Sequence, residues 1–364
     1  MSVFTRLYRG ETRIDFIGSR RRWYLASLIL IAICVLSMVF RGFNVGIDFK
    51  GGTQFQVKAS NSSLTTKAVE EAMAKTGHPA DGAAQEVGSG ATRQIVVKTQ
   101  ELNLGVQSDV QKKLGSELNI DPNKAISVDS VSSSWGSEIT KKAVQGLVVF
   151  LIVVFAYITL RFEWKMALGA LTALLHDLVI AAGIYSVVGF ELTPSTIVGL
   201  LTILGFSLYD TVVVFDKVAE NSKDLLATAK MTYAEAANLA VNQTLMRSIN
   251  TSLISLLPVA GLLFVGAGIL GVGTIKDLAL ILFVGLAIGA YSSLFLATPV
   301  VVDLKNQEPQ YRSLAKRVLA KRNSARLAAE PVLAGPPASV LRGAPAPAPK
   351  PGARPATRPA KKRP

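Results

Sequence analysis

Long apolar segments alternate with short polar ones along most of this chain. Six of them are long and apolar enough, or nearly so, for a helix of about 20 residues to cross a bilayer. They cover residues 23–40, 143–160, 166–188, 192–214, 251–275 and 278–302. The third holds His176 and Asp177, the fourth holds Asp210, and the other four carry no charge. The pattern predicts a polytopic α-helical membrane protein with six transmembrane helices.

Residues 41–142, between the first two apolar segments, have the pattern of a folded domain. Residues 53–57 alternate like a strand, residues 64–73 carry a helical stripe closed by Gly77, and residues 85–87 and 94–98 resemble two more strands. A second helical stripe covers residues 106–118, and a last strand lies at residues 126–128. The order βαββαβ predicts an α+β ferredoxin-like domain.

Basic residues fall in alternate connections, which predicts the orientation. Arg20, Arg21 and Arg22 precede the first span, whereas residues 189–191 contain no base. We therefore expect residues 1–22 in the cytosol, residues 23–40 as the first span, residues 41–142 as an extracytoplasmic domain, and residues 143–305 as the remaining five spans. The first span is longer than a signal-peptide core and lacks a small-residue cleavage site, so we expect it to stay as an anchor.

The positive charge is concentrated at the C-terminal end. Residues 306–364 hold thirteen basic and two acidic residues, and so +11 of the formal net charge of +14. A Pro/Ala-rich, basic stretch buries too little apolar area to offset its ordering entropy, so we expect a largely disordered cytosolic tail. Its charge favours anionic lipid headgroups. A ribosome or nucleic-acid contact is the alternative that charge alone leaves open, and we expect no specific nucleic-acid partner.

Ionisable side chains inside the apolar segments are candidate functional groups, because a charge in the bilayer is costly. A helical projection of the fourth span places Ser195, Gly199, Thr202 and Asp210 on one face. Arg247 precedes the fifth span at a comparable depth, so it is positioned to pair with Asp210. A carboxylate that alternately meets and loses a guanidinium takes up and releases a proton. A static salt bridge between two helices is the alternative.

The third span carries an ionisable pair, and the sixth span carries a row of small residues. His176 and Asp177 form the deepest ionisable pair and are candidates for a proton relay, although adjacent helical residues point about 100° apart. The alternative for each residue is a structural role, in which neighbouring helices satisfy its hydrogen bonds. The sixth span carries Gly285, Gly289, Ser293 and Ala297 at four-residue spacing, which predicts close packing against another helix.

The chain shows no signature of a soluble enzyme. It has no nucleotide-binding loop, zinc-type spacing or nucleophile–base set, so we expect neither an enzyme nor a cofactor or metal, and no ATP-driven step within it. Its one cysteine, Cys34, excludes an intramolecular disulfide.

An ordered series of motifs resembles one family. The first is residues 46–52, Gly-Ile-Asp-Phe-Lys-Gly-Gly, directly after the first span. Later motifs are residues 161–164, the pair His176-Asp177, and residues 207–216, 242–244, 247–252 and 291–293. With residues 14–16 and 21–24, they cover roughly residues 12 to 305. The set is similar to the SecD/SecF family of protein-export membrane proteins, in its SecF branch.

The resemblance implies a half-transporter of the RND type. Such a subunit would pair with SecD beside the SecYEG translocon and use the proton-motive force to draw exported preproteins across the plasma membrane at a late stage. It also implies that Asp210 and Arg247 take part in proton transfer. Within residues 46–52, Gly51 and Gly52 suit a hinge or a tight turn at the start of a strand, and Gly46 and Asp48 belong to the same motif.

Some positions depart from the family, and other functions stay open. Residues 205–207 read Gly-Phe-Ser where the family usually has Gly-Tyr-Ser, and Met246 replaces a small residue. The alternatives are a SecD-like paralogue, half of an RND-type exporter, or a passive structural subunit of the translocon. Both H⁺ and Na⁺ fit as the coupling ion.

Overall fold

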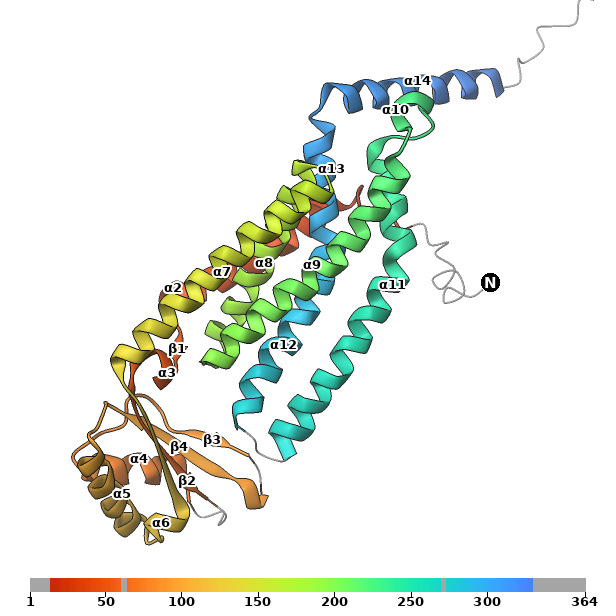
Figure 1. Ribbon diagram of the computed structural model, residues 1–364. Helices are drawn as coiled ribbons and strands as arrows, with labels where there is room; N and C mark the ends of the chain where they lie inside the picture. The colour runs from red at the N-terminus through yellow and green to blue at the C-terminus, as the bar shows by residue number, and fades with distance from the viewer. Residues whose placement is uncertain (1–13, 60–63, 89, 270–272, 330–364) are drawn as a thin grey trace, which may run out of the picture. The chain divides into compact units, whose positions relative to one another are not determined.

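The computed structural model describes residues 14–59, 64–88, 90–269 and 273–329. In these residues six helical spans are long and apolar enough to cross a membrane, as the hydropathy predicted: Arg20–Phe40, Ser133–Arg161, Trp164–Val188, Pro194–Thr228, Tyr233–Gly266 and Lys276–Asn306. Figure 1 shows them side by side as helices α2, α7, α8, α9, α11 and α12 with α13. The predicted membrane bundle is confirmed, and the tail beyond residue 329 lies outside the described residues.

Two of these helices begin well before their apolar segments. Helix α7 (Ser133–Arg161) starts where the Ser132 hydroxyl accepts a 3.4 Å hydrogen bond from the backbone N–H of Trp135. Helix α11 (Tyr233–Gly261) starts at a capping box formed by Thr232 and Glu235. Hydropathy detects only the part of a helix in hydrocarbon, whereas the caps determine where it begins. Arg247 therefore lies within a continuous helix rather than before one.

The region between α2 (Arg20–Phe40) and α7 folds as the predicted α+β domain. Its elements are β2 (Gly52–Lys58), α4 (Thr66–Lys75), β3 (Gln85–Val87), the short 3-10 helix η1 (Gly90–Thr92), β4 (Gln94–Thr99), α5 (Leu104–Leu118), α6 (Pro122–Ala125) and β5 (Ile126–Val131). The four strands pair antiparallel in the order β3-β4-β2-β5, with Phe55 opposite both Val97 and Val128. This is the strand order of a ferredoxin-like sheet.

The two faces of this sheet differ in chemistry. Alternate residues such as Phe55, Val57 and Ile95 are fully buried, in one apolar cluster with Met73 of α4 and Leu114 of α5. The intervening residues point to the opposite face and are mostly polar: Gln54, Gln56, Gln94 and Lys98. A period of two residues is what a half-buried sheet requires. The polar face is therefore free to meet other parts of the chain.

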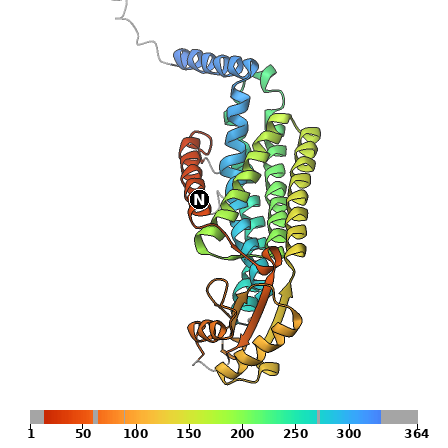
Figure 2. The same cartoon turned by 90° about the vertical axis from the view of Figure 1, so that its left-hand side faces the viewer.

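Within the bundle, α8 (Trp164–Val188) is the most enclosed of the six spans. It packs against α2, α7, α9 (Pro194–Ser222) and α12 (Gly273–Ser292), while α9 packs mainly against α12 and α11. Two π-helices, η2 (Leu262–Ile269) and η3 (Ser293–Ala297), follow α11 and α12, and α13 (Thr298–Asn306) continues the last span. Figure 2 shows α2 and α7 at opposite sides of the bundle. Within their apolar segments, residues 23–40 and 143–160, the exposed side chains are mostly apolar, as lipid contact requires.

Short elements tie the domain to the bundle. Strand β1 (Asn44–Val45) pairs in parallel with β6 (Glu191–Leu192), which lies between α8 and α9. The backbone N–H of Gly46 extends this pairing with a 2.9 Å hydrogen bond to the carbonyl of Leu192. Helix α3 (Ile47–Lys50) then leads into β2 and packs against the start of α7. The chain on both sides of the domain is thereby held at the end of the bundle.

At the other end of the bundle, residues before α2 are bound to α11. The side-chain oxygen of Asn238 accepts a 2.8 Å hydrogen bond from the N–H of Phe16, and that of Asn242 accepts a 3.0 Å bond from the N–H of Ile14. Both amide groups donate to the carbonyl of Ile14. Two asparagines one turn apart on α11 thus provide hydrogen-bond partners for backbone groups of the segment before α2.

The last span ends in an ion-pair cluster. Lys305 is almost fully buried, donates to Glu163, and lies 5.0 Å from the ring of Tyr311. Lys165 pairs with Glu308 at 2.9 Å. The remaining elements are α10 (Leu225–Thr228) and α14 (Pro309–Ala329). The chain divides into two compact units after Val318. Of the second unit, the structure describes only the end of α14, from Leu319 to Ala329.

Candidate functional site

Asp177, near the middle of α8, is buried and receives three hydrogen bonds. The hydroxyls of Ser207 on α9 and Ser292 on α12 donate to its Oδ2 at 2.6 and 2.7 Å. Its Oδ1 lies 3.0 Å from Nδ1 of His176. Buried polar groups in proteins are generally hydrogen-bonded, and this side chain follows that rule. Asp177 is therefore a carboxylate held by side chains from three helices.

His176 lies beside this carboxylate, although adjacent helical residues diverge. Its imidazole is buried and lies nearly parallel to the ring of Tyr291, with centroids 6.0 Å apart. Within the described part of the chain, Nε2 has no hydrogen-bond partner. A cavity of about 360 Å³ between α2 and α8 is lined by His176 with Ser27 and mostly apolar side chains. The structure thus brings the two predicted relay residues together.

Asp210, on α9, forms a second buried carboxylate site. The Ser248 hydroxyl of α11 donates to Oδ1 at 2.7 Å, and the Ser293 hydroxyl donates to Oδ2. Only 3% of Asp210 is exposed. Among the described residues its side chain forms no ion pair, so neutral hydroxyls alone satisfy it. An ionisable side chain buried inside a transmembrane helix is a candidate functional group.

Arg247 does not contact Asp210 in this structure. Its side chain is exposed on α11, and its backbone carbonyl accepts a 2.7 Å hydrogen bond from the Thr251 hydroxyl. The next residue, Ser248, occupies the position that the predicted salt bridge would have given to Arg247. The order of the spans predicts that Arg247 and Asp210 lie at comparable depth. It does not predict the direction in which each side chain points around its helix axis. The predicted pairing is absent from this arrangement of the helices.

The buried face of α9 also differs from the predicted one. Gly199 and Asp210 lie on it, but Thr202 is exposed and its hydroxyl bonds the carbonyl of Val198 at 2.8 Å. The buried polar positions are instead Thr196, Ser207 and Thr211. The face of α9 predicted from Ser195, Gly199 and Thr202 is therefore rotated by about a quarter turn around the helix axis from the face that is buried in the structure. Ser207 was therefore missed, although its one-turn spacing from Asp210 was a usable signal.

Helix α9 packs closely against α12 beside the two carboxylates. A Cβ at Gly285 would lie 2.1 Å from the Ile203 side chain, and one at Gly199 would lie 2.2 Å from Ile281. A Cβ at Gly289 would meet Ser207 at 3.1 Å. The face predicted from Gly285, Gly289, Ser293 and Ala297 thus packs within this chain. The spacing predicts only packing for Ser293, whereas the structure shows that its hydroxyl also donates a hydrogen bond to Asp210.

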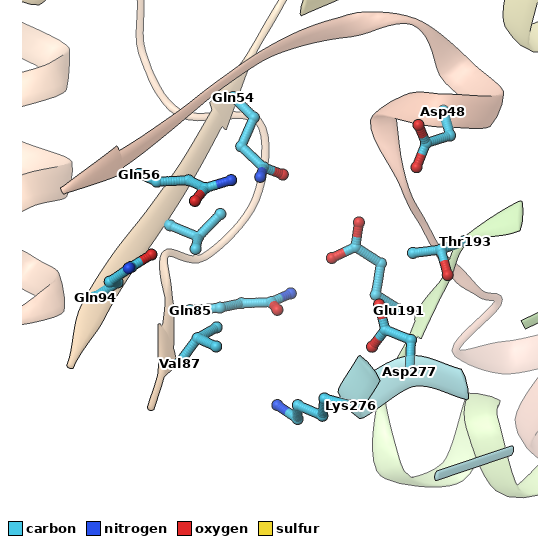
Figure 3. Close-up of a pocket in the computed structure, with 11 residues that line it drawn as sticks. Asp48, Gln54, Gln56, Gln85, Val87, Gln94, Glu191, Thr193, Lys276 and Asp277 are labelled. Carbon is cyan, nitrogen blue, oxygen red and sulfur yellow. The ribbon is translucent and has the colours of Figure 1, made fainter. Parts of the chain in front are cut away.

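The polar face of the domain meets the end of the bundle across a cavity of about 250 Å³. Figure 3 shows glutamine side chains on the sheet side of this cavity, among them Gln54 and Gln85, with carboxylates of Asp48, Glu191 and Asp277 across from them. Lys98 of β4 forms an ion pair with Glu191 of β6, and both side chains are largely shielded. This pair is a direct charged link between domain and bundle.

Asp48, in the first turn of α3, lines this cavity and lies outside the spans. Burial raises the pKa of its carboxyl, and the nearby Glu191 raises it further, while Lys98 lowers it. Gly46 must stay small because a Cβ there would lie 2.7 Å from Oε1 of Glu191. The cavity is therefore a place where proton uptake changes the charge between domain and bundle.

The glycine pair at the start of β2 has a local structural requirement. Gly51 and Gly52 have φ of +79° and +143°, values that side-chain-bearing residues rarely adopt. A Cβ at Gly51 would also lie 2.6 Å from the backbone of Ser133. This geometry is a tight turn beside the start of α7. A hinge at the same pair stays a prediction.

Metal binding has no evident site in the structure. In residues 14–59, 64–88, 90–269 and 273–329, no group of three or more His, Cys, Asp or Glu side chains is arranged to hold a metal ion.

Family models match most of the chain. The model described as "Protein export membrane protein SecD/SecF, C-terminal" matches residues 110–307, and "SecD/SecF GG Motif" matches residues 36–63. The second match contains Gly51 and Gly52.

Similar proteins carry the same description. The protein translocase subunit SecF of Streptomyces coelicolor is 47% identical over 318 residues, which are 87% of this chain and 83% of that protein. SecF of Mycobacterium tuberculosis is 47% identical over 333 residues, which are 89% of this chain and 74% of that protein. These identities extend over both the domain and the bundle.

Solved structures agree with the fold. The crystal structure of SecDF, a translocon-associated membrane protein from Thermus thermophilus, is 33% identical with a TM-score of 0.73, and the match covers 82% of this chain but 39% of that one. SecDF in a super-membrane-facing form is 31% identical with a TM-score of 0.57, covering 86% of this chain and 40% of that one. This chain thus spans about two fifths of a SecDF polypeptide.

Proposed function

Because the chain belongs to the SecD/SecF family of protein-export membrane proteins, in its SecF branch, we propose that it is a SecF-type subunit of the Sec translocase that uses a proton gradient to promote late export of preproteins. The SecDF relatives contain both halves in one polypeptide, and this chain matches about two fifths of it. We infer that a separate SecD supplies the other half. The SecYEG channel and the exported preprotein are the further partners.

The observation that carries the proposal is the pair of buried carboxylates in an apolar bundle. Asp210 is satisfied by two hydroxyls and Asp177 by two hydroxyls and a histidine. Charged carboxylates are rare at this depth and mark proton pathways in pumps and transporters. We infer that Asp210 takes up and releases the coupling proton, and that His176 and Asp177 form a second relay position.

Arg247 enters this scheme through a change in helix position. It is next to Ser248, so about 100° of rotation separates the two side chains around α11. We infer that a shift of α11 replaces the Ser248 hydroxyl at Asp210 by the Arg247 guanidinium. A guanidinium at that point favours the ionised carboxylate and so releases its proton. A static Asp210–Arg247 bridge is one form of the passive alternative, and the contact of Ser248 with Asp210 argues against that form.

The orientation follows from the basic flanks. We infer that both termini are cytosolic and that the α+β domain faces the other side, where the preprotein emerges. A proton moving down the gradient releases about 2.3 kcal/mol per 100 mV. That exceeds thermal energy several-fold, and we infer that it biases the domain between two orientations through the contacts around Gly51, Asp48 and the Lys98–Glu191 pair. The basic tail would bind anionic lipid at the cytosolic surface.

The proposal is tested with inverted vesicles from cells depleted of this chain. A preprotein is first driven part-way by the ATP-dependent motor, and its completion is then followed with and without a proton gradient. Restored chain, together with SecD, is expected to make completion depend on the gradient. Completion that is equal with and without the gradient in restored vesicles would contradict the proposal.

A further inference from the structure

The two buried carboxylates are bonded by consecutive residues of one helix. Ser292, the last residue of α12, donates to Asp177, and Ser293, the first residue of η3, donates to Asp210. The carboxylates themselves belong to different helices, α8 and α9. One peptide unit of the last span thus connects the two sites.

This connection lies where the last span changes its hydrogen-bond pattern. The π-helix Ser293–Ala297 begins at the second serine and ends just before Pro299 in the first turn of α13. A proline lacks the N–H that would bond four residues back, and a helix accommodates this loss by local rearrangement. Single π-turns within α-helices are frequently found at functional sites.

Each of these serines also has a second acceptor on its own helix. The Ser292 hydroxyl lies 3.3 Å from the carbonyl of Gly289, and the Ser293 hydroxyl lies 3.4 Å from the carbonyl of Ala290. Ser207 and Ser248 donate to the same two carboxylates from other helices. The hydroxyls of Ser207 and Ser248 donate to these carboxylates and, unlike those of Ser292 and Ser293, are given no second acceptor among the described residues.

We propose that Ser292 and Ser293 act as a paired hydroxyl switch that makes the protonation of Asp177 and of Asp210 interdependent. The switch rests on the proposed function, since it joins the coupling residue to the relay residue. When a proton from the gradient binds Oδ2 of Asp210, that oxygen becomes a donor. The Ser293 hydroxyl then accepts from it and turns its own hydrogen toward the carbonyl of Ala290. At Asp210 only the added O–H bond and the direction of the Ser293 hydroxyl change.

The neighbouring serine responds because the two acceptor carbonyls are also consecutive. A stronger hydrogen bond from Ser293 to the carbonyl of Ala290, a contact of 3.4 Å in this structure, pulls on the turn that contains Gly289, the alternative acceptor of Ser292. Gly289 itself packs tightly against Ser207, so the turn has little space in which to relax. Loss of the Ser292 donor makes the ionised form of Asp177 less favourable. Protonation at one site therefore changes proton affinity at the other.

Other groups around the two sites define the background for this effect. The titratable or charged side chains flanking them are His176 on α8, Tyr209 on α9, Arg247 on α11 and Tyr291 on α12. Of these, His176 contacts Asp177 directly, whereas Tyr209 and Arg247 are exposed. The two carboxylates also influence each other through space. The experiment must separate that direct influence from the serine switch.

A double-mutant cycle on measured titrations separates them. Protonation of Asp210 is followed by the infrared carboxyl band of the purified full chain in lipid nanodiscs, with and without Asp177→Asn. We expect Asp177→Asn to change the proton affinity of Asp210 by at least about fivefold. In the Ser292→Ala, Ser293→Ala double variant this change should disappear. In the matched Ser207→Ala, Ser248→Ala variant, which also removes one donor from each carboxylate, it should persist.

Each result decides the proposal. A change that survives in the Ser292→Ala, Ser293→Ala protein would show direct coupling through space and overturn the switch, as would no change in the native background. Should the alanine variants fail to fold, cysteine at the two positions keeps the side-chain volume and weakens the donor. No gradient or export is involved in this measurement. Failure of the switch is thus distinguishable from failure of the export function.

Discussion

The Ser248 hydroxyl donates a 2.7 Å hydrogen bond to Oδ1 of Asp210, across the contact between α11 and α9. This neutral contact stands where an ion pair with the preceding residue was expected. Among the described residues, this carboxylate is bonded by the hydroxyls of Ser248 and Ser293 and forms no ion pair. The contact also places Arg247 within a partial helix rotation of the same site. These two consequences lead to the first prediction.

Replacement of Arg247 should abolish the dependence of export on the proton gradient while leaving the stability of the fold almost unchanged. Because its side chain is exposed in this arrangement, Arg247→Gln is expected to change the free energy of unfolding by no more than about 0.5 kcal/mol. Gradient-dependent export should nevertheless be lost, since no guanidinium is available to favour release of the Asp210 proton. Thermal unfolding of the purified chain and export from vesicles measure the two effects. Arg247→Lys, which keeps a charge, should retain part of the stimulation.

The contact between α9 and α12 should be intolerant of added volume. Gly285→Val is expected to destabilise the bundle by about 1–3 kcal/mol, because its Cβ would lie 2.1–2.7 Å from three atoms of Ile203. Gly205→Ala on α9 is the control, since no atom lies within 4 Å of its added Cβ. The control should be neutral or slightly stabilising. Equal unfolding midpoints for the two variants would contradict the packing described.

The contact between domain and bundle should depend on pH through Asp48. The folded state raises the pKa of its carboxyl, so the folded state binds more protons than the unfolded state, and stability falls as pH rises from the ordinary aspartate pKa through the raised one. Asp48→Asn mimics the protonated form. It should therefore be more stable than the native chain at pH 7, and this difference should vanish below about pH 4.

Unfolding of both proteins across this pH range measures the effect. Asp109→Asn, at an exposed position on α5, is the matched control and should show no such difference. If Asp48→Asn were less stable than the native chain at pH 7, the carboxylate would be favourable in the folded state and the account of this cavity would fail.

The segment before α2 should be released by loss of the asparagine pair. Asn238→Ala removes the acceptor for the N–H groups of Phe16 and Ile17. Amide hydrogen exchange at these two residues should then rise toward the rate of an open segment. Asn250→Ala, at an exposed position on the same helix, should leave the exchange unchanged. Continued protection in Asn238→Ala would show that the apolar burial of Phe16 holds the segment by itself.

Much of this fold was predictable, because hydropathy and alternation report burial directly. The six spans and the βαββαβ order follow from which residues must avoid water. The early starts of α7 and α11 were not found, since polar helical turns beyond the hydrocarbon leave no hydropathy signal. Their capping residues, Ser132 and Thr232 with Glu235, were the signal that was available.

The candidate site was predictable only in part. Asp177 and Asp210 stand out because a charge in an apolar segment needs a reason, but their serine partners do not. A serine in a span serves equally well as a small packing residue, and Ser293 was assigned in that way. The rotation of each helix about its axis decides which polar residues meet. That rotation depends on close contacts such as Gly285 with Ile203, which no single segment reveals.

The central claim is that Asp210 carries the coupling proton, and Asp210→Asn tests it most directly. Asparagine keeps the size and hydrogen-bonding capacity of the side chain but cannot titrate. Export from inverted vesicles is compared with and without a proton gradient at matched membrane levels of protein. Glu220→Gln, an exposed carboxylate on the same helix, is the control.

The account predicts that Asp210→Asn inserts normally and exports at the gradient-free rate in both conditions, while Glu220→Gln keeps the full stimulation. Stimulation of Asp210→Asn at the native level would contradict it. The Ser248 and Ser293 contacts would then be structural, and the proton path would have to run through His176 and Asp177 or through the partner subunit.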